Sequence, residues 1–233
     1  LWRFNPYINP LDHEDPDVEW IQCQIPLIHH SNWVPYHCIH GFIHHLNKHL
    51  GLEIKPTLFQ GDLHLSLVEK ERPSPVSELT GGNEIPYWIV SAGGKFDLTI
   101  KWWSAERFQE VVDHFRGRIQ FVQVGRESDW HPKVEGAIDL RGKTTVRQLM
   151  RLVHHAQGVL CPVTALMHLA AAVETRPDAP LNRACVVIGG GREPNHWAAY
   201  GHHQFLHTIG ALPCCAEGGC WKSRTRRLGD DSK

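Results

Sequence analysis

The stretch 158–173 carries the residues best suited to chemistry, because it joins an apolar strand to a helix start. Residues 158–161 are apolar, Pro162 breaks the strand, and Thr164 is well placed to cap the helix that follows. A strand, a tight turn and a helix start direct free backbone N–H groups and the positive end of a helix dipole at one point. The sequence therefore predicts an anion-binding turn here.

Three further loops are expected at the same edge, each following an expected strand. The first brings two glycines, which permit close backbone approach, and two cations: Gly93, Gly94, Lys95 and Lys101. The second brings Glu127, and the third is the segment 189–194, GGGREP. The combination fits a nucleotide diphosphate, with lysine and N–H groups on the phosphates and a carboxylate on the ribose hydroxyls. The alternative is that these glycines only end strands and these lysines only solvate loops.

Alternating strands and amphipathic helices from residue 87 onward would position these loops. The expected strands are short and apolar: 87–91, 119–124, 137–140, 158–161 and 184–188. Between them, helices with apolar residues on one face are expected around 108–115, 146–153 and 165–172. This alternation indicates an α/β fold with a parallel sheet covered on both faces. In such sheets the ligand lies outside the carboxyl ends of the strands.

The first 82 residues have a less regular pattern. A strand is expected over 17–25, and a helix that starts near Pro35 and stops at Gly51. The histidines on the outer face of this helix stand four apart, as zinc ligands can, but a solvated face is the simpler interpretation. Alternation over 63–67 predicts a further strand, and the charged, Pro- and Ser-rich segment 69–82 predicts a linker.

Composition excludes several classes of function. The chain has 24 basic and 25 acidic side chains and a formal net charge of −1, so no overall positive field would attract nucleic acid. No apolar run approaches the roughly 20 residues of a membrane span, and the first residues lack the pattern of a signal peptide. We expect a cytoplasmic protein without a nucleic-acid partner and with at most peripheral membrane association.

Three segments resemble the bacterial heptosyltransferases, the family 9 glycosyltransferases that use ADP-heptose. Residues 101–108, KWWSAERF, are similar to the family's Lys-x-Trp-x-x-Glu-Arg-Phe segment. Residues 164–171, TALMHLAA, are similar to its Asp-Thr-Gly-Leu-Met-His-Leu-Ala-Ala-Ala signature, and 140–145 match the turn before it. The matches follow the family's order and spacing, and residues 86–191 are covered well.

The resemblance implies a GT-B fold, in which two Rossmann-like domains face each other across a cleft. Residues 1–82 would be the remnant of an incomplete N-terminal, acceptor-side domain with its linker. Residues 83–212 would form the C-terminal domain that binds the nucleotide sugar, and 213–233 a cysteine-rich basic tail. The implied donor-binding residues are Gly93, Gly94, Lys95, Lys101, Glu127, Val163, Thr164, Ala165, Leu166 and His168.

The implied reaction is inverting transfer of a sugar, heptose in the family, from an ADP-sugar to a glycan or protein acceptor. Lys101 and the helix start would stabilise the departing ADP, so no metal cofactor would be needed for transfer. The family's catalytic base lies on an early N-terminal loop, so no base is assigned and the chain is expected to be a fragment or a degenerate relative. Val163 and Ala165 replace the family's Asp and Gly, which leaves the donor sugar open.

Two other functions fit the same architecture. One is a nucleotide-binding relative without catalytic activity, and the other is a sugar-nucleotide epimerase or hydrolase. ADP binding without turnover would favour the first, and product analysis would identify the second.

The tail contains three thiols within seven residues: Cys214, Cys215 and Cys220. Such spacing suits a structural zinc or iron site, although a closed site normally has four ligands and a nearby histidine would have to supply the last. The alternative is that these cysteines are simply reduced.

Overall fold

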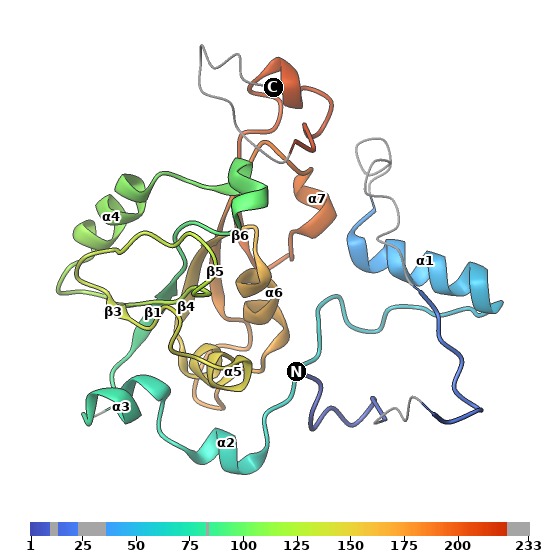
Figure 1. Ribbon diagram of the computed structural model, residues 1–233, viewed down its shortest axis with the longest axis horizontal. Helices are drawn as coiled ribbons and strands as arrows, with labels where there is room; N and C mark the ends of the chain where they lie inside the picture. Colours follow the sequence, from blue (N-terminus) through green and yellow to red (C-terminus); the bar gives the residue numbers. More distant parts are fainter. Residues whose placement is uncertain (10–13, 23–35, 83, 223–233) are drawn as a thin grey trace.

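The computed structural model describes residues 1–9, 14–22, 36–82 and 84–222. A parallel sheet of six strands lies at its centre, in the order β3-β2-β1-β4-β5-β6 (Figure 1). The strands are β1 (Tyr87–Val90), β2 (Gln120–Gln123), β3 (Ile138–Asp139), β4 (Gly158–Pro162), β5 (Ala184–Gly190) and β6 (Gln204–His207). The expected α/β fold with a parallel sheet is confirmed, and the order β3-β2-β1-β4-β5-β6 is that of a Rossmann-like sheet.

Helices connect the strands as expected. They are α4 (Ala105–His114), α5 (Val146–His155) and α6 (Ala165–Ala172). Thr145 begins α5 with a capping box that it shares with Gln148, and Ser104 caps α4 by accepting from the Arg107 amide. These caps fix where the two helices begin, and α4 starts three residues before the predicted range 108–115.

The core has two parts, one on each face of the sheet. Tyr87 and Ile89 of β1 belong to the larger cluster, which also contains residues of α5 and α6. Val90 belongs to the smaller cluster, beside Phe108 and Val112 of α4. Alternate residues of one strand thus supply opposite faces, as the pleat requires.

Arg183, just before β5, is buried at the amino end of the sheet with 3% of its surface exposed. Its guanidinium donates to the carbonyl oxygens of Ala156, Ala170, Val173 and Glu174 at 3.0–3.3 Å. Three of those carbonyls close the C-terminal end of α6, where a helix lacks partners of its own. Arg183 therefore provides hydrogen-bond donors for the carbonyl oxygens at the end of α6, whose first residue lies at the opposite edge of the sheet.

The N-terminal region contains one longer helix, α1 (Cys38–Leu50), which ends at Gly51 with φ 64°. The predicted stop is thus confirmed, whereas Pro35 lies outside the described residues. Of the α1 residues only Gly41 is buried, so the face opposite the outer histidines is only partly covered. Figure 1 shows α1 beside the α/β body rather than within its layers.

The predicted strand over 17–25 is wrong where it can be examined. Residues 17–22 are irregular, and 23–25 lie outside the described residues. The strand over 63–67 is also largely wrong, since only Leu63 forms an isolated parallel bridge, to Val173. Leu63 and Leu65 are nevertheless buried in the larger core cluster, which explains their apolar alternation.

The segment 69–82, whose composition predicts a linker, includes residues of two short helices, and its role as a linker between domains stays a prediction. It contains the end of α2 (Leu67–Glu71) and all of α3 (Pro75–Thr80), each started by a serine cap. Glu69 of α2 receives Arg147 of α5 at 2.9 Å, and Glu78 of α3 receives Arg151 at 2.8 Å. Serine and proline here start helices rather than break structure.

The chain after residue 94 holds further short elements that the sequence did not suggest. They are the 3-10 helices η1 (Phe96–Lys101) and η2 (Pro213–Cys215), the helix α7 (Asn195–Ala198) and the strand β6. Within the described ranges, no helix is long and apolar enough to cross a membrane. The boundaries at 82 and 212 and the cytoplasmic location stay predictions.

Candidate functional site

The loops at the carboxyl ends of the strands form the candidate site. In the sheet, β2 and β3 lie on one side of β1, and β4, β5 and β6 lie on the other. The loops after β1 and β4 therefore flank the point where the strand order reverses. Open parallel sheets bind ligands at this point. The loop after β1 carries η1 and Lys101, the turn after β4 carries Thr164, and the loop after β5 carries residues 191–194.

Lys101 ends η1 and points at a buried carboxylate. Its Nζ lies 2.7 Å from Oε1 of Glu193, with side-chain exposures of 18% for the lysine and 4% for the glutamate. Arg192 Nη1 also donates to that oxygen. The second oxygen, Oε2, is buried and has no hydrogen-bond partner among the described residues. The lysine was predicted, whereas Glu193 was seen only as part of the GGGREP loop.

The turn after β4 has the predicted geometry of a helix start. Thr164 precedes α6 in extended conformation, with φ −142° and ψ 175°, but its side chain does not cap the helix. Its Oγ1 is buried and lacks a hydrogen-bond partner among the described residues. The amides of Ala165 and Leu166 belong to the first turn, where helices have no internal acceptors. Val163 lies in the larger core cluster, so its side chain serves packing.

His168 stands on α6 one turn after the helix start. Its Nδ1 lies 2.8 Å from the hydroxyl of Tyr200. Burial lowers the pKa of His168, and the charge of nearby Lys101 lowers it further. The ring is therefore neutral at pH 7 and can exchange hydrogen bonds without adding positive charge.

The backbone of the two glycines after β1 lies close to Trp130. Gly94 exchanges two backbone hydrogen bonds with Trp130, of 2.8 and 3.1 Å. Gly93 has φ 88°, and a Cβ there would overlap the Trp130 carbonyl oxygen. Trp130 in turn stacks on Trp102 with ring centroids 4.2 Å apart. These contacts fix the loop that presents Lys101, while the role of the glycines toward a ligand stays a prediction.

Lys95 and Glu127 are two exposed residues among the predicted donor-binding residues. Lys95 is exposed at the start of η1, and Glu127 is exposed on the loop after β2. The loop that bears Glu127 lies against Gly142, where an added Cβ would come 3.2 Å from that of Glu127. Because β2 and β5 lie on opposite sides of the β1–β4 pair, the loops that bear Glu127 and Glu193 lie on opposite sides of these two strands.

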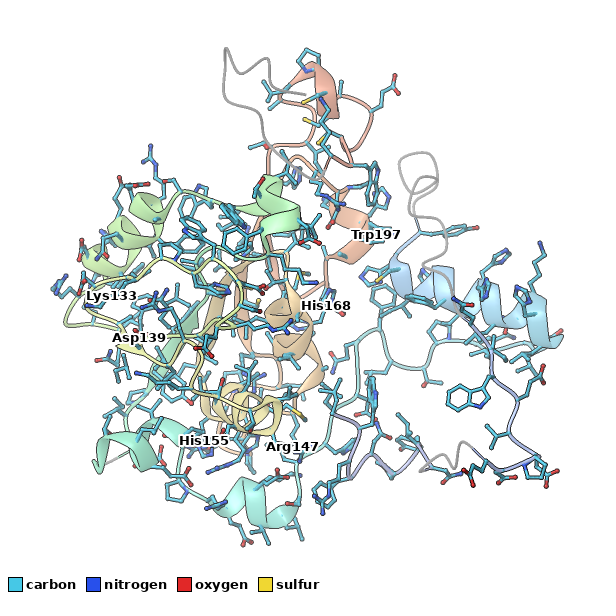
Figure 2. All side chains as sticks on the ribbon, viewed as in Figure 1. Lys133, Asp139, Arg147, His155, His168 and Trp197 are labelled. Atoms are coloured by element: carbon cyan, nitrogen blue, oxygen red, sulfur yellow. The ribbon has the colours of Figure 1, made fainter. Side chains whose placement is uncertain are left out.

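The start of α1 lies beside the same cluster, which the sequence did not reveal. The His37 ring is buried and lies 5.5 Å from that of Tyr200. Figure 2 shows His168 on α6 and Trp197 on α7 at the side of the body that faces α1. Burial lowers the pKa of His37 to about 4. The N-terminal region thus adds an uncharged wall to a site built by the sheet.

The tail cysteines do not gather into a ligand set in the part of the chain that the structure describes. Cys214 is exposed, whereas Cys215 is buried and its Sγ contacts the carbonyl oxygens of Thr208 and Leu212 at 3.4 Å. Among the described residues, no three His, Cys, Asp or Glu side chains are grouped to hold a metal ion. Cys215 fits a packing role beneath the end of β5, and the zinc or iron stays a prediction.

Comparison with known proteins agrees with this architecture. The family model described as glycosyltransferase family 9 (heptosyltransferase) matches residues 29–177. The match includes α1, the Lys101 loop and the helix start at Thr164. No curated protein sequence matches the chain significantly.

Solved structures share the fold at low sequence identity. A family 9 glycosyltransferase from Veillonella parvula DSM 2008 superposes with a TM-score of 0.57 at 18% identity, covering 74% of this chain and 49% of that chain. The ADP-heptose LPS heptosyltransferase II of E. coli gives 0.50 at 20% identity, with coverages of 66% and 46%. The chain thus spans about half the length of these structures.

Proposed function

This chain belongs to glycosyltransferase family 9, the heptosyltransferase family, and on that premise we propose that it binds an ADP-sugar and serves inverting transfer of the sugar to a glycan or protein acceptor. The E. coli structure with the same fold is described as an ADP-heptose LPS heptosyltransferase, which makes ADP-heptose the first donor to test. The GT-B arrangement, with residues 83–212 as the donor-binding domain, is part of the same proposal.

One observation carries the proposal: a lysine and a helix start lie on the two loops that flank the switch point of the sheet. A diphosphate is doubly charged and is best held by a cation together with backbone N–H groups. Lys101 has three donors and gives one to Glu193, so further donors can reach a phosphate oxygen. The first amides of α6 supply the neutral donors.

The same groups would aid the departure of ADP. In inverting transfer, an acceptor hydroxyl that has lost its proton to a carboxylate attacks the anomeric carbon, and the bond to the diphosphate breaks. The negative charge that develops on ADP would be spread over Lys101 and the start of α6. We assign no residue of this chain as the base, and these groups need no metal ion to stabilise the leaving diphosphate.

The proposal is tested by ADP binding. ADP at millimolar concentration should raise the melting temperature of the wild-type chain, because a ligand that binds only the folded state stabilises it. Lys101→Ala should remove most of this gain, since a charge-assisted hydrogen bond contributes about 1.5–3 kcal/mol. Turnover of ADP-heptose, followed by product analysis, then separates transfer from hydrolysis or epimerisation.

The matched control is Lys133→Ala. Lys133 is exposed and paired with Glu135 at 2.9 Å, and Figure 2 places it on the side of the body away from His168. It should retain the full ADP shift. No shift in the wild type, or an undiminished shift in Lys101→Ala, would contradict the proposed function.

A further inference from the structure

Glu193 is a buried carboxylate with one oxygen fully engaged and the other unused. Oε1 receives Lys101 at 2.7 Å and also Arg192. Oε2 has no partner among the described residues, although the residue is only 3% exposed. An ionised carboxylate only accepts hydrogen bonds, so Oε2 lacks a donor.

Such an arrangement is costly unless a ligand completes it. Leaving a buried charged acceptor unsatisfied costs about 1–3 kcal/mol or more. The charge itself is compensated by Lys101 and Arg192, so the missing partner need not be a cation. A hydroxyl group meets the requirement, because it donates one hydrogen bond and brings no charge.

The position of Glu193 indicates which hydroxyl this is. Lys101, on the β1 loop, and the α6 start, on the β4 turn, hold the diphosphate in the proposed function. Glu127 lies beyond them on the β2 side, where the ribose is predicted, and Glu193 lies beyond them on the β5 side. In an ADP-sugar, the group on the other side of the diphosphate from the ribose is the transferred sugar.

We infer that Glu193 binds the donor sugar, accepting a hydrogen bond from one of its hydroxyl groups through Oε2. This inference rests on the proposed function, because it takes the diphosphate to lie on Lys101. Glu193 then links the two halves of the donor: one oxygen orients the lysine that meets the phosphates, and the other recognises the sugar.

The experiment compares three ligands by calorimetry without any acceptor present: ADP, ADP-glucose and ADP-heptose. For the wild type, both ADP-sugars should bind more tightly than ADP. Glu193→Gln should reduce this preference about tenfold for at least one ADP-sugar, since a charge-assisted hydrogen bond is lost. Its affinity for ADP should change little, because the amide oxygen of the glutamine can still accept the hydrogen bond from Lys101.

Two further variants keep the result interpretable. Glu193→Asp retains the charge but shortens the side chain, so it should also lower the preference for ADP-sugars and serves if the glutamine variant does not fold. Glu135→Gln, at the exposed pair with Lys133, is the matched control and should change neither affinity.

The outcomes separate the inference from the proposed function. If Glu193→Gln weakens ADP and both ADP-sugars by the same factor, or changes none of them, the assignment of Glu193 to the donor sugar is overturned while the diphosphate site stands. If the wild type binds none of the three ligands, the proposed function fails, and this inference fails with it.

Discussion

Two buried charged residues stand at opposite ends of β5, and they differ in how their hydrogen bonds are used. Arg183 precedes the strand and donates to four backbone carbonyl oxygens. Glu193 follows it and keeps one carboxylate oxygen without a partner among the described residues. Both are 3% exposed, so burial alone does not distinguish them. The difference teaches that the protein itself satisfies the buried charge at the amino end of β5, whereas the carboxyl end keeps an unpartnered acceptor, which we propose a ligand completes.

The largest effect in this comparison is expected from Arg183→Met. It removes a buried cation and leaves several carbonyl oxygens without donors, so the free energy of unfolding should fall by about 3–5 kcal/mol. Urea unfolding measures this loss. Folded Arg183→Met should still bind ADP, because the change lies at the far end of the sheet.

The control for this variant is Arg176→Met. Arg176 pairs with Asp178 at 2.8 Å, but the arginine side chain is 39% exposed and that of the aspartate 68%. Its loss should change stability by less than about 1 kcal/mol. If the two substitutions lowered stability equally, the buried Arg183 would contribute no more than a surface ion pair, which would contradict its role at the amino end of β5.

A second, smaller effect on stability is expected in the loop after β1, at the carboxyl end of the sheet. Gly93→Ala should destabilise the chain by about 2–4 kcal/mol, because φ is 88° and the new Cβ would overlap the Trp130 carbonyl. Gly51→Ala is the matched control, since φ is 64° but no atom lies within 4 Å of the new Cβ. It should cost only about 1–2 kcal/mol, the backbone strain alone. Thermal unfolding compares them, and equal losses would contradict the tight Gly93–Trp130 contact.

The smallest effect concerns pH and involves both ends of the sheet. Burial lowers the pKa of His155 and of His37 to about 4 each. These histidines bind protons more readily in the unfolded chain than in the folded one. Their contribution to the free energy of unfolding is therefore complete above pH 6.5 and is lost as the pH falls toward 4. His155→Gln should flatten the loss of stability in this window by roughly 1–2 kcal/mol. An unchanged pH profile would show that the ring is not buried as described.

The sequence was informative where structure is local. The apolar faces of α4 and α5 and the apolar strand 158–161 are set within a few residues, and the elements they predict are present. The helix start at Thr164 is also present, although the threonine side chain does not cap it. The sequence pattern misled where residues have two uses: the apolar alternation over 63–67 predicts a strand but serves packing, and the serines near 69–82 are typical of irregular chain but cap α2 and α3.

What the sequence could not predict depends on distant partners. Glu193 is a single carboxylate between glycines and a proline, and its importance follows from meeting Lys101 across the intervening strand β4. His37 likewise reaches the site only because α1 packs beside Tyr200. A carboxylate directly after a glycine-rich strand end was the available signal for Glu193, and only the fold shows where it points.

The most direct test of the account is a hydrogen-exchange footprint with and without ADP. We predict slower exchange at the carboxyl end, in residues 95–101, 164–167 and 191–194, with no change around residues 174–178 at the amino end. Lys101→Ala should abolish the protection. Protection confined to the amino end, or none at saturating ADP, would contradict the assignment of the carboxyl end as the donor site.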